Sequence, residues 1–190
     1  MSNGRSCVFH NRHHFILYLV MIISRSFAGA LVCFSLMFAV SSPCHSACVD
    51  KRLPAMAIKD GVAIDKASGL VWRRCIVGTN WNSRKKQCDG EVKGLAQKEA
   101  LAEARRAGPG WRVPSIQELK SIRLNTCKGP KIDTRTFPNI GASDLGEGMD
   151  IWSSTTAISA DTFYYLNFSD GSLDFHSDGF NLGVLLVRKK

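Results

Sequence analysis

The sequence predicts an α+β domain with two helices and an antiparallel sheet, and three observations support this class. Residues 93–107 have helical periodicity, and a second helix-starting signature begins at Ser115. Strand-like segments lie on both sides of these helices. The later ones are separated by hairpin-type turns such as Ser169-Asp170-Gly171. Helices followed by consecutive hairpins favour an α+β arrangement over alternating β and α units.

The two predicted helices have clear ends. Small apolar side chains recur on one face of 93–107, and Gly108-Pro109 ends that helix. The second helix starts at Ser115, where Glu118 three residues later completes a capping box. Its expected end is near Asn125, because glycine and proline follow shortly afterwards.

Short runs of strand-forming residues define the expected sheet. Residues 48–60 are predicted to be a polar lead-in, 76–89 a loop rich in turn formers and bases, and 128–149 a long connection. The strands are expected at 62–65, 70–74, 150–155, 162–168, 172–176 and 182–188.

The N-terminal segment predicts export from the cytosol. Residues 1–47 contain no acidic residue and hold a mostly apolar run whose second piece, 27–40, is short for a bilayer span. We therefore expect a signal peptide over 1–47 and a mature domain over 48–190, periplasmic or extracellular, without a stable membrane span. An uncleaved anchor would place Arg25 inside the bilayer at a high cost. Lipid modification of Cys48 is a third option, although His45-Ser46-Ala47 lacks the usual apolar residue ahead of the cysteine.

The charge of the mature domain favours anionic partners. All 16 acidic residues and 22 of the 25 basic residues follow residue 47, so 48–190 carries a net charge of about +6. Such a charge attracts sulfated polysaccharide, phospholipid headgroups or nucleic acid at long range. Export makes nucleic acid the least suitable of these, and we expect none.

The cysteine count predicts two disulfides. Of the seven cysteines, four lie after residue 47, and an even number in an exported domain indicates disulfide pairing. Three pairings are possible; we prefer Cys75–Cys88, which closes a local loop, with Cys48–Cys127. A zinc site is a poor alternative, because no Cys-x-x-Cys spacing occurs and an oxidising compartment opposes free thiolates.

Several short motifs stand in a fixed order along 62–188. They are Asp65-Lys66-Ala67-Ser68-Gly69-Leu70-Val71-Trp72-Arg73-Arg74-Cys75, Trp81 with Cys88-Asp89-Gly90, Ala100-Leu101, Trp111-Arg112-Val113-Pro114-Ser115-Ile116-Gln117-Glu118-Leu119, Ile132-Asp133 with Phe137-Pro138, Ile151-Trp152-Ser153-Ser154-Thr155 and Val187-Arg188. In this order the motifs resemble the Lcl C-terminal domain family across nearly all of 62–188.

The resemblance implies a fold and a function. The family is similar to C-type-lectin-like folds, and its named member is a surface adhesin whose domain is associated with sulfated glycosaminoglycan binding. One departure concerns the last strand, where Leu185 and Leu186 occupy the positions that are arginine and cysteine in many relatives. These leucines predict a more deeply buried strand, and they remove that arginine as a ligand residue.

The candidate ligand-binding residues lie in or beside the Cys75–Cys88 loop. They are Trp81, Arg84, Lys85, Lys86 and Arg74. Sulfate and carboxylate groups pair well with arginine forks and clustered lysines, and Trp81 could stack on a sugar ring. Strand alternation places Arg73 on the face opposite Arg74, so both cannot join one patch. The plainer interpretation is a solvated loop tip, with Trp72, Trp111 and Trp152 filling the core.

Enzymatic and metal-dependent functions are weaker alternatives, and we expect no cofactor and no catalysis. Only His176 follows the leader, so a serine-histidine site at 153–155 would depend on it. Three aspartates, Asp170, Asp174 and Asp178, could contribute to a calcium site, but aspartate is also an ordinary turn residue. The leading alternative to glycan binding is an envelope or pilus-associated protein–protein module that uses 128–149 and the hairpin tips.

Overall fold

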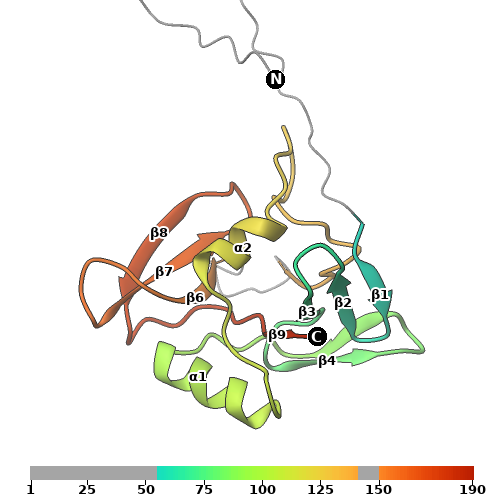
Figure 1. Cartoon of the computed structure of the whole chain (residues 1–190), viewed down its shortest axis with the longest axis horizontal. Coiled ribbons are helices and arrows are strands. Elements are labelled where there is room, and N and C mark those ends of the chain that lie inside the picture. Colours follow the sequence, from blue (N-terminus) through green and yellow to red (C-terminus); the bar gives the residue numbers. More distant parts are fainter. Residues whose placement is uncertain (1–54, 141–149) are drawn as a thin grey trace, which may run out of the picture. The chain divides into compact units, whose positions relative to one another are not determined.

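The computed structural model describes residues 55–140 and 150–190, and it confirms the α+β class (Figure 1). The described part has three antiparallel sheets and two helices. The first sheet has the order β1-β2-β3-β9, with strands Ala57–Lys59, Val62–Asp65, Leu70–Arg73 and Val187–Lys189. The second is a hairpin of β4 (Thr79–Asn82) and β5 (Gln87–Gly90). The third contains β6 (Asp150–Thr156), β7 (Thr162–Asn167) and β8 (Leu173–Ser177).

The helices are shorter than predicted because their flanks form tertiary backbone bonds. Helix α1 covers Gln97–Arg106, and the residues before it are extended, with Leu95 N–H donating to the Leu182 carbonyl. Helix α2 covers Ile116–Ile122 and ends before Asn125. The chain leaves the helix there because Leu124 N–H donates to the Lys131 carbonyl at 2.7 Å.

Two further strand predictions need correction. The expected lead-in 48–60 contains β1, which pairs with β2, and β9 is shorter than the predicted strand 182–188. Residues Leu182–Leu186 bond to several partners in turn instead of forming one ladder; for example, the Val184 carbonyl accepts from Val77 N–H and the Leu186 carbonyl accepts from Arg73 N–H. This segment lies in the interior, which confirms the predicted burial of the leucines: Leu185 and Leu186 are almost fully buried.

The core consists of two apolar clusters. The larger joins the first sheet to α2 and the third sheet, and Trp72 lies in it with its ring edge-to-face against Phe137. The smaller joins α1 to Trp152 and the 182–186 segment, and Trp152 Nε1 donates to the Leu95 carbonyl at 2.8 Å. The core assignment of these two tryptophans is therefore confirmed. The third, Trp111, is only half-buried.

The predicted capping box at Ser115 is confirmed, and Arg112 extends it. Ser115 Oγ accepts from Glu118 N–H, and Glu118 Oε2 accepts from Ser115 N–H at 2.8 Å. The two guanidinium Nη atoms of Arg112 also bond Glu118, at 2.6 and 2.7 Å. These bonds, above all those from Arg112, lower the pKa of Glu118 from the ordinary 4.5 to about 2.

We expect Glu118 to make the protein acid-sensitive. A carboxyl whose pKa is lowered by folding stabilises the protein above its unfolded pKa, and this stabilisation disappears as the pH falls from about 4.5 toward 2. With allowance for solvent screening, the loss should be about 1–2 kcal/mol. Urea unfolding between pH 2 and 7 measures it, and Glu118→Gln should flatten that part of the profile. The control is Glu91→Gln, at an exposed glutamate. An equal slope in wild type and Glu118→Gln would contradict the assignment.

Candidate functional site

The predicted loop 76–89 is instead a β-hairpin anchored by a disulfide. Strands β4 and β5 pair in antiparallel register, with Trp81 opposite Cys88. The predicted Cys75–Cys88 disulfide is confirmed, with a Cα–Cα distance of 5.7 Å, and it ties β5 to the end of β3. Sequence reasoning missed the strands because 79–82 and 87–90 hold few strand-forming residues, and pairing between them compensates.

The hairpin tip presents three basic side chains on a turn held by Asn82. Its side-chain Oδ1 accepts from the backbone N–H groups of Arg84 and Lys85, at 3.0 and 3.1 Å, and its carbonyl accepts from Lys86 N–H at 2.8 Å. Lys86 closes the turn in a left-handed conformation, with φ of 57°. All three basic residues are exposed. The tip, defined as Arg84–Lys86, therefore combines exposed cationic groups with a fixed backbone.

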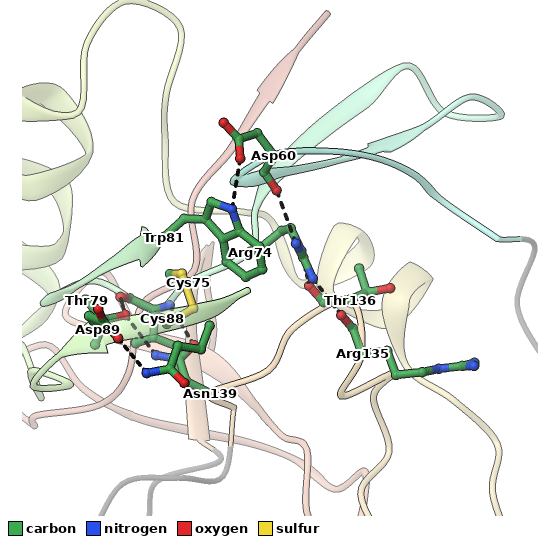
Figure 2. Close-up of a disulfide and its surroundings, with 12 residues drawn as sticks. Asp60, Arg74, Cys75, Thr79, Trp81, Cys88, Asp89, Arg135, Thr136 and Asn139 are labelled. Atoms are coloured by element: carbon green, nitrogen blue, oxygen red, sulfur yellow. Dashed lines mark hydrogen bonds between the residues drawn. A yellow bond between two sulfur atoms is a disulfide. The ribbon is translucent and has the colours of Figure 1, made fainter. Parts of the chain in front are cut away.

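Arg74 lies beneath the hairpin rather than at its surface (Figure 2). Its guanidinium lies over the Trp81 ring, 3.9 Å from the centroid. It donates to three carbonyl oxygens, those of Asp60, Arg135 and Thr136, at 3.1, 2.7 and 2.9 Å. Arg74 is buried, so in this structure it holds Trp81 in place and does not project into solvent.

Asp60 fixes the other side of Trp81, and sequence reasoning did not identify it. Its Oδ1 accepts from Trp81 Nε1 at 3.0 Å and from Ser83 Oγ at 2.5 Å. The Ser83 and Trp81 hydrogen bonds lower the pKa of Asp60. Gly61 allows this approach, because a Cβ there would lie 2.9 Å from the Trp81 Cβ.

Acidic residues partly neutralise the tip. Asp89 accepts from Gln87 and Asn82, bonds that lower its pKa, and pairs with Lys85 at 3.3 Å. Asp60 is also close enough for the charge of Lys86 to act on it. The three basic side chains of the tip therefore have two carboxylates, Asp60 and Asp89, near them. Arg84 forms no ion pair within residues 55–140 and 150–190. The tip keeps a net positive charge, and Arg84 is its least compensated member.

The predicted ligand residues fall into two groups. Arg84, Lys85 and Lys86 are together and exposed, and their binding role stays a prediction. Trp81 is half-buried, and one face of its ring is covered by Arg74. Arg73 contacts a different tryptophan, with its guanidinium 5.1 Å from the Trp111 centroid. The two neighbouring arginines thus point to different surroundings, as strand alternation predicted.

The residues considered for metal binding or catalysis have local structural partners. Asp170 Oδ1 accepts from Ser172 N–H and Asp174 Oδ1 from Phe175 N–H. Within the described ranges, no group of three or more metal-binding side chains is assembled. His176 stacks on Phe180 with centroids 3.6 Å apart, and its Nδ1 accepts from Ser177 N–H.

The remaining predictions about export fall partly outside the described residues. The predicted signal peptide 1–47, its cleavage region and Cys48 are all outside the residues that the structure describes. Cys127, its predicted partner, is disulfide-bonded. No helix among the described residues is long and apolar enough to span a bilayer.

The amino-acid sequence matches a known family over most of its length. The family described as the Lcl C-terminal domain matches residues 61–188, from the turn after β1 to β9. The chain belongs to this family. No curated protein matches it. The matched region of this Lcl C-terminal domain contains the disulfide, the basic tip and both helices. A disulfide in such a domain is typical of an oxidising, non-cytoplasmic location.

Proposed function

We propose that this Lcl C-terminal domain is an exported, non-enzymatic module that binds an anionic or carbohydrate ligand, of the glycosaminoglycan type, at the cell envelope. The observation that carries the proposal is the tip: three exposed basic side chains on a turn already fixed by Asn82, Asp60 and the disulfide. A preorganised loop loses less entropy on binding than a flexible one. Trp81, half-buried beside it, suits contact with a sugar ring.

The electrostatics of the tip support a polyanion over a neutral sugar. Clustered arginine and lysine side chains form charge-assisted hydrogen bonds with sulfate and carboxylate groups. The net charge of about +6 over 48–190 would add long-range attraction. The positions of His176 and Ser153 support a non-enzymatic role, since His176 stacks on Phe180 while the hydroxyl of buried Ser153 donates to the Tyr164 carbonyl.

The test is binding of the exported protein, with its disulfides formed, to a glycan array that includes heparin-like polymers at low and moderate salt. Changing Arg84, Lys85 and Lys86 to alanine should raise the apparent Kd about 10- to 100-fold, because exposed ion pairs contribute up to about 1 kcal/mol each. The matched control changes Lys66, Lys98 and Lys128 to alanine, removing the same charge from scattered exposed positions. Equal losses in both variants would show that only net charge matters.

An envelope protein is the second candidate partner, and exposed apolar side chains favour it. Ile158 is 75% exposed, and Leu173 and Phe175 on β8 are 39% and 38% exposed. Contiguous exposed apolar surface is typical of protein interfaces. Absence of binding to every glycan, at either salt concentration, would overturn the glycan proposal and favour this partner.

A further inference from the structure

A polar cavity lies at a different place from the tip, between the end of β3, the start of β4 and the C-terminal end of α1. Its volume is about 350 Å³. Charged side chains at its wall come from three segments: Arg73 from β3, Lys93 from the approach to α1, and Glu103 and Arg106 from α1. Its size is at the lower end of the range for small-molecule sites and suits a single sugar-sized ligand.

The wall of this cavity is preformed. Gly78 takes φ of 99°, and a Cβ there would lie 2.2 Å from the Glu91 carbonyl oxygen. The backbone segments at Gly78 and Glu91 are therefore in very close contact. Lys93 N–H donates to the Val77 carbonyl, which fixes the segment that carries Lys93. The Cys75–Cys88 disulfide holds the other end of the wall. A ligand would therefore meet a cavity that needs little rearrangement.

Arg73 is a half-buried cation with no anionic partner among the described residues. One of its N–H groups, at Nη2, donates to the Ala107 carbonyl at 3.2 Å, and its guanidinium lies over Trp111. No carboxylate within 4 Å pairs with it in the described ranges. Burial lowers the pKa of Arg73, and no neighbouring charge offsets that effect. A partly desolvated cation is stabilised by an anion placed against its remaining donors.

The distribution of charge around the cavity selects the kind of ligand. Glu103 and Arg106 pair with each other at 2.5 Å and so neutralise one another, while Lys93 has no ion pair in the described part of the chain. Arg73 and Lys93 thus leave two uncompensated positive charges. The carboxylate of Glu103 and the side chain of Asn80 are polar groups that suit ligand hydroxyls.

From these observations we propose that the cavity at Arg73 and Lys93 binds a small hydroxylated organic anion, a sugar acid with a single carboxylate. The carboxylate accepts hydrogen bonds from Arg73 and from Lys93, and the ligand hydroxyls face Glu103 and Asn80. This site differs from the proposed glycan-binding tip in its position, in the size of its ligand and in its need for a cavity. It does not depend on the tip's function.

The experiment is a titration of the disulfide-formed protein with galacturonate, followed by amide NMR shifts and calorimetry, beside galactose, which lacks the carboxylate. Galacturonate should shift the amides of Val77–Asn80, and galactose should bind at least about 10-fold more weakly. Arg73→Gln should raise the Kd for galacturonate about 10-fold or more, and Lys93→Gln about 3- to 10-fold, as expected for charge-assisted hydrogen bonds. Lys98→Gln, at an exposed residue of α1 outside the cavity wall, is the matched control.

Two further variants distinguish loss of the cavity site from misfolding and from binding at the tip. Lys93 is exposed, so Lys93→Gln should fold normally even if Arg73→Gln does not. The variant with alanine at Arg84, Lys85 and Lys86 should bind galacturonate as wild type does, which separates this site from the tip. The proposal is overturned if galacturonate shifts only tip residues, if galactose binds equally well, or if folded Lys93→Gln binds as tightly as wild type.

Discussion

Replacing Arg74 with alanine is expected to lower the free energy of unfolding by about 3–5 kcal/mol. The substitution removes the guanidinium that donates to the carbonyl oxygens of Asp60, Arg135 and Thr136. Breaking a buried charged network has a cost of this size, because the remaining polar groups are left unpaired. It also removes the group that covers one face of Trp81. Urea unfolding at pH 7 measures the loss.

Two comparisons separate the shape of Arg74 from its charge. Arg74→Lys keeps the charge but has no planar fork, so it should recover less than half of the loss. Arg84→Ala, at an exposed arginine on the same hairpin, should change stability by less than about 0.5 kcal/mol. If Arg74→Ala and Arg84→Ala were equally mild, the three carbonyl bonds would not stabilise the fold.

Removal of the Cys75–Cys88 disulfide is the second change that we expect to lower the free energy of unfolding strongly. With a sequence separation of 13 residues, the cross-link should contribute about 3 kcal/mol by restricting the unfolded chain. We expect the double variant Cys75→Ala/Cys88→Ala to lose about 2–4 kcal/mol. Alanine is preferable to serine at position 75, because Cys75 is only 7% exposed and a serine hydroxyl would be buried.

The double substitution isolates this disulfide better than chemical reduction does. Reduction of the wild type would also open the disulfide that contains Cys127. Reduction of the double variant then reports the Cys127 disulfide alone. The hairpin has other anchors besides the cross-link: Asn139 accepts from Ile76 N–H at 3.2 Å and donates to the Thr79 hydroxyl at 2.8 Å. An unchanged urea midpoint in the double variant would mean that Arg74, Asp60 and Asn139 already hold the hairpin without the cross-link.

Local patterns were sufficient for several features of the site and fold. Helix α2 starts at Ser115 because its capping box needs only two side chains three residues apart. Periodic apolar residues placed β2, β3, β6, β7 and β8 within a residue or two of their observed positions. The Cys75–Cys88 pair closes a short segment, so proximity along the chain favoured it. The exposure of Arg84, Lys85 and Lys86 followed from a turn-rich, charged stretch.

Long-range contacts decided what the sequence could not. In sequence, Arg74 looks like the exposed basic residues of the tip, but it is buried beneath Trp81 and bonds carbonyls 61 and 62 residues away. The cavity at Arg73 and Lys93 exists only because α1 and the start of β4 meet there. By itself, the sequence determined the α+β class, the local disulfide and the basic tip, since these depend on residues close along the chain. The tertiary structure decided which arginines stay available to a ligand, because burial and carbonyl partners come from distant segments.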